Sequence, residues 1–278
     1  MSKGLLNNKV VGILGYPIGH TLSPLFQNAA FKASGIKADY VVFEVEPKDL
    51  KDALTVIRSP EFLGVNLTIP HKEKAILFLD KISTMAKKCG SVNTVVNQNG
   101  KLRGETTDGL GFILSLKEAG VAPEKKRILL AGAGGAARSV AFALAETGAD
   151  IYLTNRTVEK GEKLVSDLKD CYPRNTVVYI PFSEKSDALR RKKIDILINA
   201  TSVGLTTEEE LFRPKDLTEK LIVCDLIYNR QTLLLRSAQK LGLKTVDGLG
   251  MLIHQGALSF RLWTGKTAPI KKMFAAVK

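Results

Sequence analysis

The chain has 278 residues, of which 45% are hydrophobic and 25% charged, and its formal net charge is +13. This composition is typical of a globular protein and excludes a fibrous or largely disordered chain, and no apolar run approaches the roughly 18 residues of a membrane span. The N-terminal residues MSKGLLNNKVVGILGYP lack the long apolar stretch and cleavage site of a secretory signal, so we expect a cytoplasmic protein.

The excess of positive charge raises the possibility of nucleic-acid binding. The basic residues are spread along the chain, however, and the densest run, 190–193, directly precedes an apolar segment. A solvated helix end explains that run better than a nucleic-acid surface. The three cysteines and three histidines are widely scattered, which predicts neither a disulfide framework nor a metal site. We therefore expect no nucleic acid, membrane or metal among the partners, whereas a basic surface would attract anionic small molecules.

The first third of the chain alternates short β-rich runs with amphipathic helical stretches, which is the pattern of βαβ units. The expected strands are 10–15, 38–47 and 64–70, and the expected helices are 23–35, 49–59 and 71–82. Residues 91–96 and 101–106 then predict a hairpin, because the connection Asn97-Gln98-Asn99-Gly100 contains an Asn-Gly turn signal.

A helix over 109–120 precedes a second βα series. Its strands are expected near 127–131, 150–156, 177–182, 194–204, 221–228 and 244–248, with helices between them. This order predicts a doubly wound, Rossmann-like α/β domain. The last helix, 250–265, has no following strand, so we expect it to return to the first domain. The predicted domains are 1–107, completed by 249–278, and 108–248.

A glycine-rich loop opens the second series. Gly132, Ala133, Gly134, Gly135 and Ala136 fit the pattern GxGxx(G/A) directly after an apolar strand and directly before a helix. Glycines allow backbone amides to approach a pyrophosphate, which then lies at the helix N-terminus. An ordinary strand-to-helix turn is the structural alternative, but the context favours dinucleotide binding.

The end of the next strand indicates which dinucleotide. An NAD site would place Asp or Glu about twenty residues after the glycines. Here the chain has Asn155, Arg156 and Thr157, with Lys160 one helical turn beyond Arg156. A guanidinium matches a phosphate and a carboxylate would repel it, so the sequence favours NADP. A helix capped by Thr157 and followed by surface charges would also explain this segment.

Two further segments contain candidate substrate ligands. Ser23 is placed as an N-cap with Pro24 at the first helical position, and together with Thr21 it could form a small carboxylate-binding nest. The segment 64–72 ends a buried strand in polar residues and places Lys72 in the first turn of a helix, where the dipole disfavours a cation. That position suggests a functional use, although exposed lysines are common.

With these motifs the chain resembles the shikimate dehydrogenase family along essentially its whole length. The motifs are GYPIxHxxSP at 15–24, GxNxTxPxK at 64–72, SVNT at 91–94, TDGxG at 107–111, GAGGAAR at 132–138, NRT at 155–157, NATSVG at 199–204, DLIY at 225–228 and GxxMLxxQGxxxFxxWTG from 248. Only the glycine loop is widely shared among other families.

The resemblance implies reversible, NADPH-dependent reduction of 3-dehydroshikimate to shikimate, a step toward chorismate and the aromatic amino acids, by a monomer or homodimer. It implies an N-terminal substrate domain, and a catalytic pair formed by Lys72 and Asp108. The implied substrate ligands are Thr21, Ser23 and Tyr228 at the carboxylate, and Asn66, Thr68, Asn93, Asp108 and Gln255 at the ring hydroxyls. Thr201, Leu226, Gly248 and Met251 are implied to join the glycine loop and the NRT segment around NADP.

Three departures from the family pattern stand out. Thr21 replaces a more usual serine, Thr106 stands where asparagine normally precedes Thr-Asp-Gly, and the residues after Tyr228 lack a common proline and are more closely spaced. Three alternatives also stay open. They are a related enzyme that acts on quinate as well as shikimate, with broader substrate or NAD use, a non-catalytic protein of the same fold, and a nucleic-acid binder. Retention of Lys72, Asp108 and Gln255 argues against a non-catalytic protein.

Overall fold

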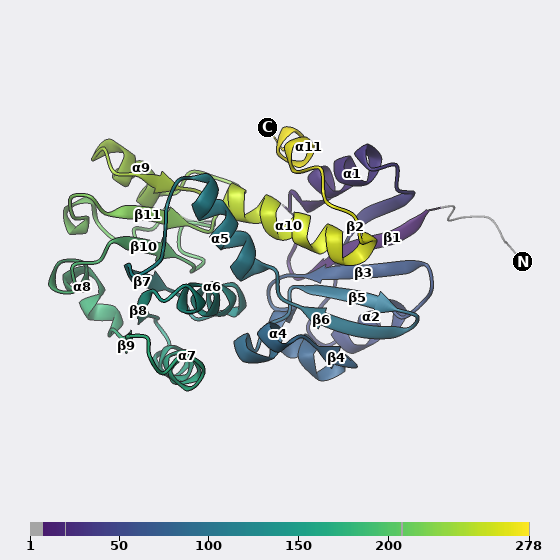
Figure 1. Cartoon of the computed structure of the whole chain (residues 1–278), viewed down its shortest axis with the longest axis horizontal. Coiled ribbons are helices and arrows are strands. Elements are labelled where there is room, and N and C mark those ends of the chain that lie inside the picture. The colour runs from purple at the N-terminus through teal and green to yellow at the C-terminus, as the bar shows by residue number, and fades with distance from the viewer. Residues whose placement is uncertain (1–7, 20, 207, 278) are drawn as a thin grey trace, which may run out of the picture. The chain divides into compact units, whose positions relative to one another are not determined.

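The computed structural model describes residues 8–19, 21–206 and 208–277. The chain divides into two units, unit 1 comprising Met1–Thr107 with Ile253–Lys278 and unit 2 comprising Asp108–Leu252. Figure 1 colours the first part of unit 1 purple to blue and unit 2 mainly teal to green. The yellow helix α10 (Gly248–Thr264) begins in unit 2, and its residues from Ile253 onward belong to unit 1.

Unit 1 is built on a mixed six-stranded sheet with the strand order β2-β1-β3-β5-β6-β4. Its strands are β1 (Lys9–Gly15), β2 (Ala38–Glu44), β3 (Phe62–Leu67), β4 (Lys81–Ile82), β5 (Thr94–Gln98) and β6 (Lys101–Glu105). Its helices are α1 (Ser23–Ala33), α2 (Leu50–Val56), α3 (His71–Lys74), η1 (Ala75–Phe78), α4 (Thr84–Cys89) and α11 (Ile270–Ala275). The parallel pairing of β2, β1 and β3 brings the loops after these three strands to one edge.

The predicted hairpin of β5 and β6 is confirmed. Its two-residue turn has Asn99 at φ 53° and Gly100 at φ 85°. Both angles lie in the left-handed region that a type I′ turn requires, which explains the Asn-Gly sequence.

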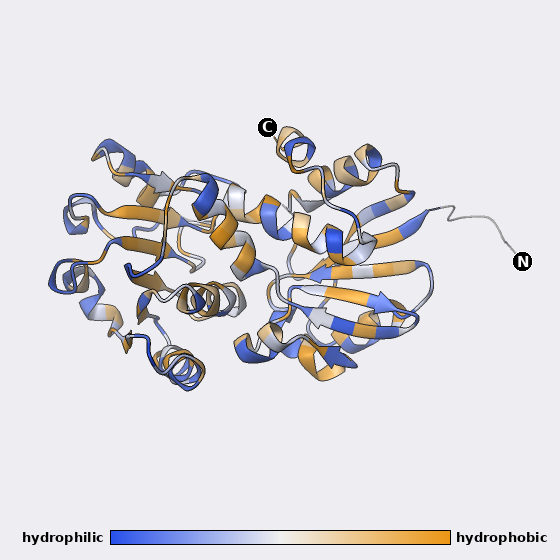
Figure 2. Ribbon diagram, in the orientation of Figure 1, coloured by the Kyte–Doolittle hydropathy of each residue, from blue (hydrophilic) through white to orange (hydrophobic). Residues whose placement is uncertain are grey.

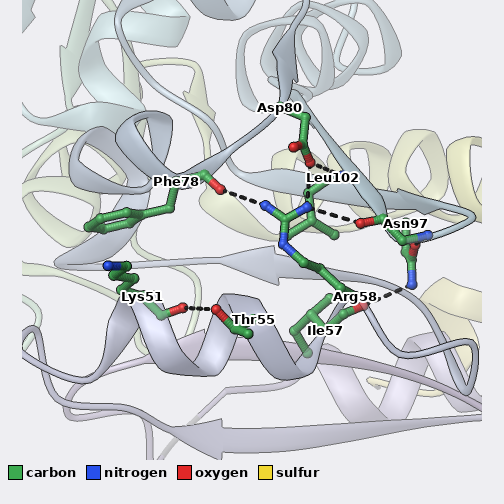
Figure 3. Close-up of polar contacts among 9 residues, drawn as sticks. Lys51, Thr55, Ile57, Arg58, Phe78, Asp80, Asn97 and Leu102 are labelled. Atoms are coloured by element: carbon green, nitrogen blue, oxygen red, sulfur yellow. Dashed lines mark hydrogen bonds and ion pairs between the residues drawn. The ribbon is translucent and has the colours of Figure 1, made fainter.

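The predicted helix over 71–82 is wrong after residue 78. After α3 and η1 the chain leaves the helical conformation, and β4 pairs in parallel with β6. Asp80 accepts a hydrogen bond from the amide of Leu102 at 2.7 Å and also bonds the guanidinium of Arg58 (Figure 3). The same guanidinium donates to the carbonyl oxygens of Gly100 and Phe78, so one arginine after α2 joins three segments. These contacts override the apolar periodicity of the segment.

The core of unit 1 includes Leu14, Leu54 and Leu67, which are almost fully buried. The C-terminal part of α10 packs closely on the rest of the unit. The indole N–H of Trp263 donates to the carbonyl of Val95 at 3.0 Å, and Gly64 leaves room for that ring.

Unit 2 is a parallel six-stranded sheet with the strand order β12-β11-β10-β7-β8-β9. Numbered within the unit this is the Rossmann order 3-2-1-4-5-6, so the predicted doubly wound domain is confirmed. Its strands are β7 (Arg127–Ala131), β8 (Asp150–Thr154), β9 (Val177–Tyr179), β10 (Ile196–Asn199), β11 (Ile222–Asp225) and β12 (Thr245–Val246). Its helices are α5 (Asp108–Glu118), α6 (Gly135–Glu146), α7 (Val158–Cys171), η2 (Phe182–Glu184), α8 (Lys185–Arg191), η3 (Pro214–Asp216) and α9 (Leu233–Lys240).

Figure 2 colours β10 and β11 largely as hydrophobic, as expected for strands covered on both faces. The basic run 190–193 ends α8 and is fully exposed, which confirms a solvated helix end. The last long helix begins at Gly248 and not at residue 250 as predicted.

Glycines allow several helices to approach neighbouring elements closely. A Cβ at Gly109 would collide with the carbonyl oxygen of Ser139, so this residue lets α5 lie against α6. Within α10, a Cβ at Gly250 would lie 2.9 Å from the Ser115 side chain, and one at Gly256 would collide with the ring of Phe26. Gly250 and Gly256 therefore let α10 approach its neighbours closely.

Candidate functional site

The loop after β1 carries the two hydroxyls of the proposed carboxylate nest. Ser23 is not the N-cap that the sequence predicts, because α1 begins at Ser23 and Leu22 occupies the cap position without a side-chain bond. The capping function lies with Thr21, whose hydroxyl accepts the backbone N–H of Ser23 at 3.2 Å. Ser23 is buried and Thr21 half-buried. The neighbouring His20 lies outside the described residues.

Two backbone hydrogen bonds tie the loop after β3 to the end of β1 and the segment that follows it. The amide of Thr68 donates to the carbonyl of Leu14 at 2.9 Å, and Tyr16 donates to Ile69 at 3.0 Å. Both bonds join the loop after β3 to the segment leaving β1, which fixes the polar end of β3 beside the first loop.

Two hydrogen bonds fix the backbone around Lys72, one to its own carbonyl oxygen and one from the side chain of the preceding residue, His71. Its carbonyl accepts the amide of Val92 at 2.8 Å. The imidazole of the buried His71 lies 2.7 Å from the carbonyl of Val45 through Nε2, which must donate because a carbonyl oxygen only accepts. Burial lowers the pKa of His71, the hydrogen bond to Val45 partly offsets this effect, and the nearby charge of Lys74 lowers the pKa further. Lys72 itself is half-buried, so part of this residue is accessible to solvent.

Asn93 joins three motifs that lie far apart in the sequence. Its side-chain oxygen accepts the amide of Thr107 at 2.7 Å, and its side-chain nitrogen donates to the Thr107 hydroxyl at 2.8 Å and to Oε1 of Gln255 at 3.2 Å. All three residues are buried. Asp108, the residue after Thr107, is also buried and begins α5. The SVNT, TDGxG and C-terminal motifs therefore converge in one polar network of unit 1, which includes the residue directly before α5.

Asn66 extends this network further into unit 1. Its oxygen accepts from the hydroxyl of Tyr40 at 2.8 Å, and its nitrogen lies within 3.1 Å of the hydroxyls of Thr94 and Ser259. Thr94 and Ser259 are themselves 2.7 Å apart. The amide of Asn66 is thus engaged by protein groups, whereas the resemblance implies a role at the substrate ring.

The sequence interpretation missed Tyr40, Thr94 and Ser259 as members of this network. Thr94 belongs to the SVNT motif, and Ser259 lies four residues after Gln255 on α10, on the same helical face. Tyr40 occupies an inward position in the alternating burial pattern of β2. The helical periodicity of α10 could therefore have suggested Ser259, and the strand periodicity of β2 could have suggested Tyr40.

The glycine loop of unit 2 has the geometry that its sequence predicts. Gly132 has φ 119°, and a Cβ there would lie 2.6 Å from the carbonyl oxygen of Ala200, so only glycine fits. Gly134 caps α6, and a Cβ there would meet no atom within 4 Å. Gly135 begins α6, whose first turn carries no acidic residue, and Ala136 follows it. This open N-terminus, preceded by the buried Ala133, fits a pyrophosphate.

The end of β8 fits a 2′-phosphate. Arg156 and Lys160 are exposed, and neither forms an ion pair within the described residues. The side-chain nitrogen of Asn155 donates to the carbonyl of Thr157 at 2.8 Å. Thr157 is the N-cap of α7, but its hydroxyl makes no capping bond. Capping therefore explains where Thr157 stands in the chain, but not why this residue carries a hydroxyl.

The remaining cofactor candidates lie around the ends of β10 and β11. The hydroxyl of Thr201 donates to the side-chain oxygen of Asn199 at 2.7 Å, and the amide of Leu226 donates to the Asn199 carbonyl at 2.9 Å. The amide of Gly248 donates to the carbonyl of Ile227 at 3.3 Å. Met251 is buried, and Tyr228 is half-buried in the loop after β11.

The described residues show no sign of two other classes of site. No group of three or more His, Cys, Asp or Glu side chains there could hold a metal ion. No helix in the same part of the chain is long and apolar enough to cross a membrane. The polar groups of unit 1 instead suit a small hydroxylated anion, and the loop and cations of unit 2 suit a phosphorylated dinucleotide.

Comparison with known proteins adds an independent finding. Three family models match the chain: the shikimate dehydrogenase substrate binding domain at residues 13–95, shikimate/quinate 5-dehydrogenase at residues 115–231, and the shikimate 5′-dehydrogenase C-terminal domain at residues 248–278. The chain is 43% identical over 268 residues to a shikimate dehydrogenase (NADP⁺) of Alkaliphilus metalliredigens, covering 95% of this chain and 94% of that protein.

Two solved structures are similar over nearly the whole chain. One is the Thermus thermophilus shikimate 5-dehydrogenase in complex with NADP(H) and shikimate, with a TM-score of 0.87, 35% identity and coverage of 96% of this chain and 98% of that one. The other is the quinate dehydrogenase of Corynebacterium glutamicum in complex with NAD, with a TM-score of 0.89, 28% identity and coverage of 97% and 98%.

Proposed function

Because the chain belongs to the shikimate dehydrogenase family, we propose that it catalyses the reversible reduction of 3-dehydroshikimate to shikimate with NADPH. The product would lead on to chorismate and the aromatic amino acids. The observation that carries this proposal is the network of Asn93, which bonds Thr107 and Gln255 and thereby gathers three family motifs in one buried polar cluster.

Most of the proposed substrate ligands belong to unit 1, while Asp108 and Tyr228 belong to unit 2, which is also proposed to bind the cofactor. Thr21, Ser23 and Tyr228 would bind the substrate carboxylate through their hydroxyls, and Asn66, Thr68, Asn93, Asp108 and Gln255 would define the position of the ring hydroxyls. In unit 2, Gly132–Ala136 would cradle the pyrophosphate, and Arg156 with Lys160 would bind the 2′-phosphate. Thr201, Leu226, Gly248 and Met251 would line the remaining cofactor surface.

Lys72 and Asp108 are proposed as the catalytic pair. NADPH, when bound, supplies the hydride for the carbonyl carbon. Negative charge then develops on the carbonyl oxygen, which the ammonium of Lys72 would stabilise and protonate, and in the reverse direction the amine would accept the proton. The carboxylate of Asp108 would orient the ammonium toward the carbonyl oxygen. The backbone bond of Lys72 to Val92 and the Asn93–Thr107 bonds beside Asp108 support fixed positions for both.

NADP is proposed in preference to NAD. The end of β8 presents two exposed cations and no carboxylate at the ribose position, since residues 155–157 are Asn, Arg and Thr. We further propose a cytoplasmic enzyme that acts as a monomer or homodimer and requires neither nucleic acid nor membrane.

The loss of NADPH absorbance on addition of 3-dehydroshikimate tests the proposal directly. The full-length chain should show turnover that depends on both compounds. Parallel assays with NAD⁺ and quinate separate the proposal from its nearest rival, since the quinate dehydrogenase among the similar structures was solved with NAD. Turnover of quinate alongside shikimate, or comparable use of NAD⁺, would favour the rival, and no turnover of any pair would favour a non-catalytic protein.

A further inference from the structure

Asp225, the last residue of β11, is a buried carboxylate that the proposed mechanism does not use. Its relative exposure is 1%, and no ion pair involves it in the described part of the chain. Burial raises the pKa of this carboxyl, partly offset by hydrogen bonds from neighbouring groups. A buried carboxylate destabilises the fold unless several hydrogen-bond donors surround it. The donors around Asp225 therefore indicate its function.

Three donors from different segments converge on Asp225. The side-chain nitrogen of Asn199 lies 3.1 Å from each carboxylate oxygen. The amide of Ile227 donates to Oδ1 at 3.0 Å, and the hydroxyl of Thr232 donates to Oδ2 at 2.7 Å. One carboxylate therefore accepts from the end of β10, from the turn after β11 and from the start of α9.

The first donor leads to the turn that carries Thr201. The oxygen of the Asn199 side chain accepts the amide and the hydroxyl of Thr201 at 3.0 and 2.7 Å. Asp225 binds the nitrogen of the same amide, so it fixes the orientation in which Asn199 presents its oxygen to Thr201.

The other two donors enclose the loop that carries Tyr228. Ile227 is the residue before Tyr228, and Thr232 closes the loop four residues after it. The Thr232 hydroxyl also accepts the amide of Leu235 at 3.3 Å, as the N-cap of α9. Hydrogen bonds from both ends of this loop therefore meet at one carboxylate.

We propose that Asp225 is a positioning residue that fixes the Tyr228 loop and the Thr201 turn together and so tunes the binding of substrate and cofactor. The roles of Tyr228 and Thr201 in this inference rest on the proposed function. Asp225 itself would contact neither ligand and would act only through Asn199, Ile227 and Thr232. A change of the Asp225 side chain should therefore weaken the binding of both shikimate and NADP⁺, although their proposed contacts lie in different loops.

Asp216 provides a matched control in the same unit. It is also a buried carboxylate, at 4% exposure, and it accepts from the Ser186 hydroxyl at 2.9 Å and the Arg213 amide at 3.0 Å. Its partners carry none of the proposed site residues. Loss of its charge should therefore reduce stability without altering ligand binding.

The experiment compares Asp225→Asn, Thr232→Val, Thr232→Ser and Asp216→Asn with the wild type. The measurements are calorimetric titration of the full chain with NADP⁺, KM and kcat for shikimate, and thermal melting. Asp225→Asn and Thr232→Val should raise the NADP⁺ Kd and the shikimate KM by about tenfold, the effect of losing a hydrogen bond to a charged group. The serine variant keeps the hydroxyl and should stay within about twofold of the wild type in both constants.

The two proposals can fail separately. If Asp225→Asn and Thr232→Val lower the melting temperature as Asp216→Asn does but leave Kd and KM unchanged, the positioning role is wrong. If Asp225→Asn does not fold, the Thr232 pair decides, because equal constants for valine and serine would overturn the inference. A wild type that binds NADP⁺ but reduces no substrate would refute the proposed function, while the NADP⁺ titrations would still test Asp225.

Discussion

Arg156 should determine most of the cofactor preference. It is exposed at the end of β8 and forms no ion pair within the described residues, so its guanidinium is accessible to a phosphate. A charge-assisted bond to the 2′-phosphate contributes about 1.5–3 kcal/mol, so NADPH should exceed NADH in kcat/KM by about tenfold or more. Arg156→Ala should remove much of that difference, with the loss appearing for NADPH alone.

Steady-state kinetics with both cofactors measures this preference. Lys169→Ala is the control, because Lys169 is an exposed cation in the last turn of the same helix, α7. Equal use of NADPH and NADH by the wild type would contradict our interpretation of the residues that follow β8.

His71 should make the stability of the fold depend on pH. Burial lowers the pKa of its imidazole below the ordinary value of 6.5. The unfolded chain therefore binds more protons than the folded chain between these two pKa values, and the free energy of unfolding should fall as the pH is lowered below about 6.5. Protonation would also place a charge beside Lys74.

Thermal melting of the wild type and His71→Gln between about pH 5 and pH 8 tests this effect. The wild type should lose stability on the acid side of the range, whereas the glutamine variant should show a shallower dependence there while being less stable near pH 8. Parallel curves for the two proteins would show that His71 does not titrate as its burial implies.

At the scale of elements, the packing of α5 on α6 depends on Gly109. A Cβ at this position would collide with the carbonyl oxygen of Ser139, a backbone atom that cannot rotate away. Gly109→Ala should therefore destabilise unit 2 by about 1–3 kcal/mol, the usual cost of overpacking. Gly19→Ala is the control for chemical or thermal unfolding, because a Cβ at Gly19 meets no atom within 4 Å. An unchanged free energy of unfolding in Gly109→Ala would mean that the two helices can separate freely.

The elements that the sequence predicted best are those with a strong local signal. The parallel strands of unit 2 are continuous apolar runs, and the Asn99-Gly100 turn requires left-handed angles that few other residues adopt. One error occurred where a tertiary contact decides the structure. Asp80 bonds Leu102 and Arg58, which places residues 81–82 in a sheet. The error at Ser23 is a local one, because the hydroxyl of Thr21, two residues earlier, takes the capping function that the pattern gave to Ser23.

At the scale of the whole molecule, motif order along the chain predicted the family and the residue types of the candidate site. It could not predict how these residues are bonded. Asn93 contacts Gln255 across 162 positions, and Ser259 reaches Thr94 across 165, so only folding brings them together. Asp225 was recognisable as part of the DLIY motif, but its three donors come from segments whose proximity no local pattern reveals.

The central claim is that Lys72 and Asp108 act on one proton during hydride transfer. Steady-state kinetics of Lys72→Ala, Asp108→Asn and the double variant, with circular dichroism to verify folding, test it most directly. Lys72→Ala should lower kcat by roughly 10²–10⁴, with a much smaller effect on NADPH affinity. Asp108→Asn should also be slow, and the double variant should lose far less than the product of the single losses, because residues that act as a unit are not additive. A folded Lys72→Ala with near wild-type kcat, or losses that multiply fully, would contradict the account.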